Sequence, residues 1–386
     1  MKLDGIKVVE LSQFLPGPHL TMVMADHGAD VIKIEPLNTG EPARSSGLIK
    51  SGKSVWFRNT HRGKRSLKLN LKDPRGKKVL LKLCKGADVL VESFRPGVVD
   101  RLGIGYDTVE KHAPQIVYCS LSAFGQSSRY RDRPAHDIAI QALAGMLSLN
   151  LGQDGKPTSP STFAADMAGS LMALNGILMA LLKQRQTGQG DYIDIALHDC
   201  LISWTPTVTG PIFAEHRPNL AKEERNWGGA AFYNIYETKD GKYIVLGGVE
   251  RKFCENFLNK AGRADLISTA LQSPGPAQEP VKDFLRLFFK ERTQQEALSW
   301  LDGTDICYAP LRNLYEGFFD PNTRERGMLL FDEQGNEHIG VPIKFRNEPA
   351  KPNLQLPEFG EHSAEILREE GFGEEEIEQL VREGVI

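Results

Sequence analysis

The sequence predicts an α/β fold, with a doubly wound parallel sheet in a large domain and a second, smaller α+β domain. Over the first 125 residues, short apolar runs alternate with stretches in which apolar residues recur at helical spacing. This alternation is typical of βαβ units, which build parallel sheets. Later in the chain, the stretch NIYETKDGKYIVLGG predicts a hairpin that belongs to the smaller domain.

The strands expected in the large domain are the apolar runs at residues 6–11, 29–35, 88–91 and 115–120, and DYIDIAL after residue 190. The best-marked helix begins at Pro74, because Asp73 suits the N-cap and proline suits the first helical position. Gly86 closes this helix. Residues 135–184 are expected to be mainly helical, with a polar loop between two helices.

These patterns divide the chain into consecutive parts. Residues 1–210 form the large domain, 211–226 a polar linker and 227–314 the small α+β domain, with a helix expected at 251–261 and a strand at 305–311. Residues 315–386 form a second linker and a C-terminal segment of two short amphipathic helices.

Composition narrows the function classes. The 386 residues hold 47 Lys and Arg against 50 Asp and Glu, a balance that argues against a nucleic-acid partner. The chain has no uninterrupted apolar run of membrane-spanning length and no apolar leader, so we expect a cytoplasmic protein without a membrane partner. Five scattered cysteines without a CxxC pair, and no HExxH, predict no metal site.

A nucleotide bound through a glycine-rich loop is not predicted either. The first strand is not followed by GxGxxG, and no GxxxxGK[ST] occurs. A ligand of this sheet must be held by side chains or by other loops at the carboxyl ends of the strands. Two basic clusters in loops after strands suit a phosphate-bearing ligand, namely Lys64 with Arg65, and Arg95 with Arg101.

Three titratable residues are candidates for catalysis, and each has a structural alternative. His136 precedes Asp137 at the start of a helix, where it would otherwise be a half-buried neighbour of a capping aspartate. Asp166 lies in the apolar stretch FAADMAG, where it would otherwise be an N-cap. Glu250 follows two glycines after a strand and would otherwise be an ordinary acid at a helix start.

Six stretches, taken together and in order, resemble the family III coenzyme A transferase superfamily of the CaiB/BaiF type. They are VELSQFLPGPHLTMVMADHGADVIKIE, RGKRSLKLNLKDPRG, DVLVESFRPGVVDRLGIGYD, HDIAIQALAG, ADMAGSLMALNGILMALL and GQGDYIDIAL. The resemblance extends from about Leu3 to the tail. It implies a large α/β domain to which the C-terminal segment returns, and two chains threaded through each other as an interlocked homodimer.

The superfamily contains both transferases and α-methylacyl-CoA racemases, and the resemblance implies a different role for Asp166 in each. In the transferases the matching aspartate is a nucleophile that attacks an acyl-CoA thioester and later carries CoA as an enzyme thioester. In the racemases the same aspartate and a histidine, matched here by His136, exchange the α-proton of the thioester through an enolate.

Individual residues favour one chemistry or the other. His136, Glu250 and the PGPH stretch with His19 are closer to the racemases, and the resemblance implies that Glu250 orients the catalytic pair. Thr162 replaces the racemase asparagine, and the stretch GEPAR resembles the transferases. We therefore expect a racemase of 2-methylacyl-CoA thioesters, with CoA transfer to a free acid through Asp166 as the alternative.

The expected mechanism uses no prosthetic group, and coenzyme A enters as part of the acyl-CoA substrate. Neutral His136 removes the α-proton of one enantiomer, and protonated Asp166 returns a proton to the other face. Backbone N–H groups at the start of the Asp166 helix are expected to hold the enolate oxygen. The candidates for contact with coenzyme A are Lys64, Arg65, Phe94, Arg95 and Arg101, with Phe94 near the adenine.

Overall fold

The structure is a computed structural model that describes residues 1–152 and 154–386. The chain forms two compact units. The first comprises Met1–Ala144, Thr162–Ser203 and Phe318–Ile386, and the second comprises Gly145–Ser161 and Trp204–Gly317. The second unit therefore includes the segment before Asp166 and residues 204–226, beyond the range 227–314 expected for the small domain.

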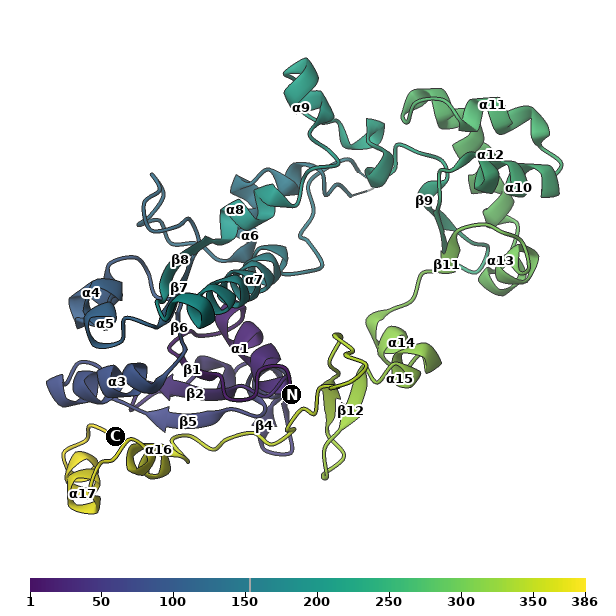
Figure 1. The fold of residues 1–386 in the computed structure, drawn as a ribbon. Helices are drawn as coiled ribbons and strands as arrows, with labels where there is room; N and C mark the ends of the chain where they lie inside the picture. The colour runs from purple at the N-terminus through teal and green to yellow at the C-terminus, as the bar shows by residue number, and fades with distance from the viewer. Residues whose placement is uncertain (153) are drawn as a thin grey trace. The chain divides into compact units, whose positions relative to one another are not determined.

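The first unit contains a six-stranded sheet in which every neighbouring pair is parallel (Figure 1). This arrangement confirms the predicted α/β class with a parallel sheet. The strand order is β5-β2-β1-β6-β7-β8, with bounds Arg65–Lys68, Asp30–Glu35, Lys7–Glu10, Val89–Glu92, Val117–Ser122 and Asp191–Ala196.

Helices cover both faces of this sheet because successive strand residues point to opposite sides. Val8 packs in one core and Val9 in the other. The Val8 side is covered by α1 (Pro16–Asp26) and α7 (Ala164–Thr187). The Val9 side is covered by α3 (Pro74–Gly86), α5 (Tyr106–His112), α16 (Ser363–Glu369) and α17 (Glu374–Arg382).

Shorter elements complete the first unit. The helices are α2 (Val55–His61), α4 (Val98–Leu102), α6 (Asp137–Leu143), α8 (Leu197–Ser203) and α15 (Pro321–Glu325). Two small antiparallel pairs are β3 (Ile49–Lys50) with β4 (Lys53–Ser54), and β12 (Leu329–Phe331) with β13 (Glu337–Ile339).

The second unit has its own core around an antiparallel sheet of order β11-β10-β9. Its strands are β9 (Tyr233–Glu237), β10 (Tyr243–Gly247) and β11 (Tyr308–Pro310), so the expected hairpin is present and the strand expected at 305–311 is shorter. Its helices include α9 (Gly210–Glu215), α10 (Arg251–Lys260), α11 (Ile267–Ala270), α12 (Glu279–Lys290) and α13 (Gln294–Leu301), and α14 (Leu314–Phe318) runs to the boundary between the units.

Two local predictions differ from the structure. The helix expected from residue 135 ends at Leu143, and the following Gly145 has a φ of +82°, a left-handed conformation that suits glycine and ends the helix. Residues 65–68, expected in a loop, form strand β5 and pair with β2. The helix that begins after Asp73 is confirmed, because Asp73 accepts a hydrogen bond from the backbone N–H of Arg75.

Helix α7 has the length and composition of a membrane span, and no other helix in the described ranges does. Half of its most apolar stretch is buried within the protein, where Ala173, Ile177 and Leu181 pack against the sheet. The apolar character of the buried side of α7 therefore follows from its place as a core helix of the first unit.

Candidate active site

Asp166 lies in the first turn of α7, and a residue from another helix caps that turn. The Oδ1 atom of Asp137 accepts hydrogen bonds from the backbone N–H groups of Ala165 (2.7 Å) and Asp166 (3.1 Å). The alternative in which Asp166 is the N-cap is therefore wrong, because Phe163 occupies the N-cap position and Asp137 supplies the capping carboxylate. The carboxyl group of Asp166 is left for other contacts.

The environment of Asp166 favours its protonated form. Burial and the nearby negative charge of Asp137 raise the pKa of Asp166 to about 7. A carboxyl group with such a pKa exists in both protonation states near neutral pH, as a group that both takes and returns a proton must.

His136 is connected to the turn that carries Asp166 by its neighbour Asp137. It occupies the N-cap position of α6, its side chain makes no capping hydrogen bond, and the residue is exposed. The next residue, Asp137, is buried and binds α7, while its Oδ2 accepts a hydrogen bond from Gln141 Nε2 (2.5 Å). The beginnings of α6 and α7 are thus fixed to each other, one carrying the imidazole and the other the carboxyl group.

The expected oxyanion donors are already occupied. The N–H groups of Ala165 and Asp166 bind Asp137, and the N–H of Met167 donates to the carbonyl of Phe163 (3.0 Å). These three groups are therefore not available to hold the enolate oxygen, because a carboxylate 28 positions before Ala165 caps this helix, which the sequence did not reveal.

Glu250 belongs to the second unit. It precedes α10 at the N-cap position, its side chain makes no capping hydrogen bond, and it is exposed. This placement agrees with the structural alternative, in which Glu250 is an ordinary acid at a helix start. Its expected role in orienting His136 or Asp166 stays a prediction.

A pocket of about 420 Å³ lies at the carboxyl ends of four neighbouring strands of the first unit. It is lined after β1 by Leu11 and Gln13, after β2 by residues 36–39, after β5 by residues 69–72 and after β6 by Phe94. The strand order reverses between β1 and β6, since β2 and β5 continue in one direction and β7 and β8 in the other (Figure 1). Ligands of open α/β sheets bind at such a switch point.

Of the residues expected to contact coenzyme A, Phe94 lines this pocket. Its backbone N–H donates to Glu92 Oε2 (2.8 Å), which fixes the turn after β6. Arg95 is exposed beside it, and Arg101 is exposed in α4, one residue before Leu102, which also lines the pocket. Three of the five expected contact residues therefore lie at or next to the pocket.

A second arginine approaches Arg101. A methyl group at Gly97, which has a φ of +80°, would lie 3.3 Å from Arg101 Nη1 and 3.4 Å from Arg131 Nη2. Glycine at this position thus lets two guanidinium groups converge on one stretch of backbone. Converging like charges repel each other, and a phosphate would relieve the repulsion by binding both.

Lys64 and Arg65 are not placed at the pocket. The ammonium of Lys64 is buried and binds Glu10 Oε2 (2.8 Å) and the carbonyl of Pro18 (2.9 Å). Arg65 begins β5, at the end of the strand opposite the pocket, and pairs with Asp30 and Glu369. The expectation of a basic cluster in a loop is corrected, because Lys64 is buried against Glu10 and Arg65 belongs to strand β5. The expected contact of these residues with coenzyme A stays a prediction.

Sequence reasoning missed Gln13, Lys72 and Arg131 as candidate contacts. Lys72 follows β5, which was not predicted, so its position at the carboxyl edge of the sheet went unnoticed. The signal that could have identified Lys72 is the short alternating pattern SLKLNLK before a strong helix start. Arg131 lies 30 positions after Arg101, and only the folded chain brings the two together.

The described ranges 1–152 and 154–386 contain no group of three or more His, Cys, Asp or Glu residues placed to hold a metal ion. His19, the histidine of the PGPH stretch, instead forms a hydrogen bond between its Nδ1 and Ser170 Oγ (2.8 Å). Ser170 is one helical turn after Asp166 in α7, so this bond ties α1 to the helix that carries the candidate catalytic carboxyl group.

Comparison with curated proteins gives relatives of two kinds over the whole chain. The human α-methylacyl-CoA racemase is 36% identical over 394 residues, covering 100% of this chain and 98% of the relative. The human succinyl-CoA:glutarate CoA-transferase is 29% identical over 401 residues, covering 100% of this chain and 90% of the relative.

Solved structures show the same fold. The crystal structure of a CAIB/BAIF family protein from Brucella suis has a TM-score of 0.83 and 28% identity, and the match covers 95% of this chain and 99% of the other. The model of the family described as CoA-transferase family III matches residues 3–363. The chain therefore belongs to CoA-transferase family III.

Proposed function

We propose that this protein is a racemase that interconverts (2R)- and (2S)-2-methylacyl-CoA thioesters by proton transfer at the α-carbon. The observation that carries the proposal is the anchoring of α6 to α7 through Asp137, which fixes the element bearing His136 to the turn bearing Asp166. The greater identity to racemases, 36% against 29% for the transferase, agrees with it.

In the proposed reaction, neutral His136 takes the α-proton of one enantiomer, and the electron pair of the broken C–H bond moves into the thioester to form an enolate. Protonated Asp166 then donates its proton to the opposite face and becomes a carboxylate. The reverse direction begins with the Asp166 carboxylate and the protonated imidazole. Each turnover thus needs one proton shared by the pair, and burial beside Asp137 makes Asp166 able to hold it near neutral pH.

The nucleotide part of coenzyme A is proposed to lie in the pocket at the carboxyl ends of β5, β2, β1 and β6. Phe94 and the aliphatic Leu37 and Leu102 supply apolar contacts for the adenine, and the basic group of Lys72 reaches the same pocket. Arg101 and Arg131 meet at Gly97, where they are proposed to bind phosphate.

The alternative is CoA transfer, which requires Asp166 alone. Its carboxylate attacks the thioester carbonyl and the C–S bond breaks. CoA thiolate is released, and a mixed anhydride of the acyl group with Asp166 is formed. The thiolate then attacks the Asp166 carbonyl to give an enzyme–CoA thioester as the acid departs. The observation that favours this alternative is that, among residues 1–152 and 154–386, no side chain forms an ion pair with the Asp166 carboxylate that would compete with nucleophilic attack, while its backbone N–H is already capped.

The pH profile of kcat/KM separates the two chemistries. For the racemase we expect a bell-shaped profile of kcat/KM against pH. The value falls at low pH, where His136 and Asp166 together gain a second proton, and at high pH, where they lose the proton they share. The two enantiomers must give pH profiles of the same shape, because the equilibrium constant of their interconversion fixes the ratio of their kcat/KM values. The transferase needs only the carboxylate, so kcat/KM would rise to a plateau as Asp166 ionises around pH 7. A plateau extending to pH 9 contradicts the racemase.

The homodimer of interlocked chains is also part of the proposal. Three apolar side chains on α7, Leu171, Met179 and Leu182, are 42%, 65% and 69% exposed, although half of that helix's apolar stretch is buried. Their spacing of eight and three residues places them along one side of the helix. We expect light scattering to give twice the mass of the chain, and Leu182→Glu to shift the protein toward monomer. A monomeric mass for the unaltered chain contradicts this part.

A further inference from the structure

We propose that Glu41 is a positioning residue for the coenzyme A pocket, because it holds the turn between β1 and α1 in a backbone conformation that the turn would not adopt alone. This inference rests on the proposed use of the pocket for coenzyme A. Glu41 does not line the pocket, and it acts through Phe14 and the adjacent Gln13.

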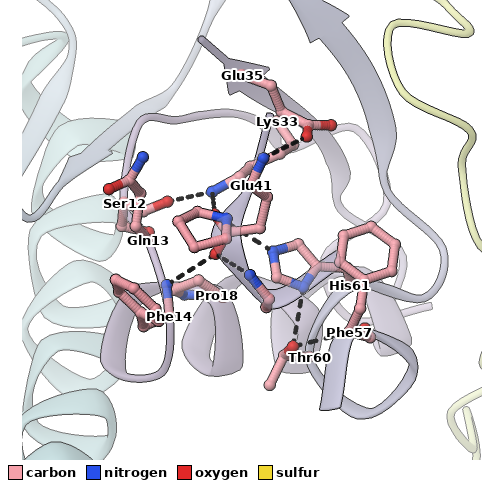
Figure 2. Close-up of polar contacts among 12 residues, drawn as sticks. Ser12, Gln13, Phe14, Pro18, Lys33, Glu35, Glu41, Phe57, Thr60 and His61 are labelled. Carbon is pink, nitrogen blue, oxygen red and sulfur yellow. Dashed lines mark hydrogen bonds and ion pairs between the residues drawn. The ribbon is translucent and has the colours of Figure 1, made fainter. Parts of the chain in front are cut away.

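Glu41 is 1% exposed and its carboxylate bridges three parts of the first unit (Figure 2). Its Oε1 accepts hydrogen bonds from the backbone N–H of Phe14 (3.0 Å) and of Ala43 (3.3 Å). Its Oε2 forms an ion pair with Lys33 Nζ (2.8 Å) in β2. The carboxylate thus links the turn after β1 to the strand beside it.

Phe14 needs such a support. Its φ is +64°, in the left-handed region that is unfavourable for a residue with a side chain. Phe14 is 40% exposed, and the centroid of its ring lies 6.0 Å from that of Trp56, so burial offers this residue limited compensation. The hydrogen bond to a buried carboxylate is the contact that favours this conformation.

Two buried lysines also hold the turn between β1 and α1, by donating hydrogen bonds to backbone carbonyl groups on either side of Phe14. Lys33 Nζ donates to the carbonyl of Ser12, and Lys64 Nζ donates to the carbonyl of Pro18 (2.9 Å). Both lysines also pair with Glu10, so two ammonium groups face two carboxylates (Figure 2 shows Lys33 and Glu41). Burying four charges is costly, and the benefit visible here is a rigid turn.

The turn is also packed closely. A methyl group at Gly17 would lie 2.0 Å from Ser12 Oγ, so the backbone of α1 lies directly against the turn. The backbone N–H of Gln13 donates to Ser93 Oγ (3.1 Å) in the loop after β6. Gln13 lines the pocket between these fixed atoms, and a change of φ at Phe14 would move it.

The test is the effect of Glu41→Ala on the affinity for coenzyme A, measured by calorimetry, and on KM and kcat. We expect Kd and KM to rise about tenfold while kcat stays within twofold, since Asp166 and His136 are untouched. Glu41→Gln keeps an acceptor for the Phe14 N–H and should stay within threefold of the unaltered protein. Phe14→Gly adopts positive φ freely and should restore most of the affinity when combined with Glu41→Ala.

If Glu41→Ala fails to fold, two variants of Phe14 that keep Glu41 test the same inference. Phe14→Val resists positive φ and should weaken coenzyme A binding, whereas Phe14→Gly should not. Asp26→Asn is the matched control, because Asp26 is a buried carboxylate paired with Arg62 away from the pocket, and its loss should lower stability without changing Kd.

Two results would overturn the inference: an unchanged Kd in Glu41→Ala, or a defect in Kd that Phe14→Gly does not relieve. Neither result touches the proposed function, because binding of coenzyme A is measured without turnover. The proposed function itself is contradicted if the unaltered protein binds no coenzyme A.

Discussion

Asp166→Asn should abolish both the racemisation of 2-methylacyl-CoA and any transfer of CoA, with kcat falling by about 10³-fold or more. Asparagine can neither accept nor return a proton at neutral pH, nor attack a thioester as a carboxylate does. The measurement is the initial rate with each enantiomer and with a free acid acceptor. Asp199→Asn is the control, because Asp199 is an aspartate on α8 whose side chain is 80% exposed.

The same variant should be more stable than the unaltered protein at pH 8. The folded state keeps the Asp166 proton up to about pH 7, whereas the unfolded chain releases it near the ordinary pKa of an aspartate. Folded stability therefore falls as the pH rises between those values, and Asn removes this penalty. We expect a gain of roughly 1–2 kcal/mol in the free energy of unfolding at pH 8 and a smaller gain at pH 5, measured with denaturant. A loss of activity accompanied by lower stability would instead indicate damage to the fold.

His136→Ala should separate the two chemistries. We expect racemisation and α-hydrogen exchange to fall by about 10²–10⁴-fold, because one face of the substrate loses its proton carrier. Stability should change little, since the imidazole is exposed and caps no helix. Exogenous imidazole should restore part of the activity, because the side chain is reachable from solvent.

The comparison variant for His136 is His112→Ala, which removes another exposed histidine, whose Nδ1 lies 2.9 Å from the backbone carbonyl of Thr108 in its own helix. It should keep full activity. If His136→Ala racemises at the unaltered rate, the histidine plays no part in proton transfer, and the alternative that relies on Asp166 alone is favoured.

Local signals predicted most of the parallel sheet. Asp73 and Pro74 identified the start of α3, and the apolar runs identified β1, β2, β6, β7 and β8. Strand β5 was not predicted because its sequence RSLK contains a single apolar residue and follows a basic, glycine-containing stretch, so it shows no apolar run. Because β5 was not predicted, Arg65 was expected in a loop, and Lys72 was not identified as a residue at the carboxyl edge of the sheet.

The sequence identified candidate residues of the site but not the contacts that position them. Asp166 and His136 were identified from motifs, whereas the capping of α7 by Asp137 joins residues 28 and 29 positions apart. The support of Phe14 by Glu41 spans 27 positions, and the burial of Lys64 depends on Glu10, 54 positions earlier. Such contacts leave no periodic signal, because the geometry of the sheet decides which distant side chains meet.

The racemase proposal is tested most directly by following the α-hydrogen of a pure 2-methylacyl-CoA enantiomer in deuterated water by NMR, with hydroxylamine added in a parallel reaction. We expect deuterium to enter the α-position as the enantiomers interconvert, and no hydroxamate to form at Asp166. Absence of exchange, together with a hydroxamate at Asp166 and movement of CoA to a free acid, would contradict the racemase proposal.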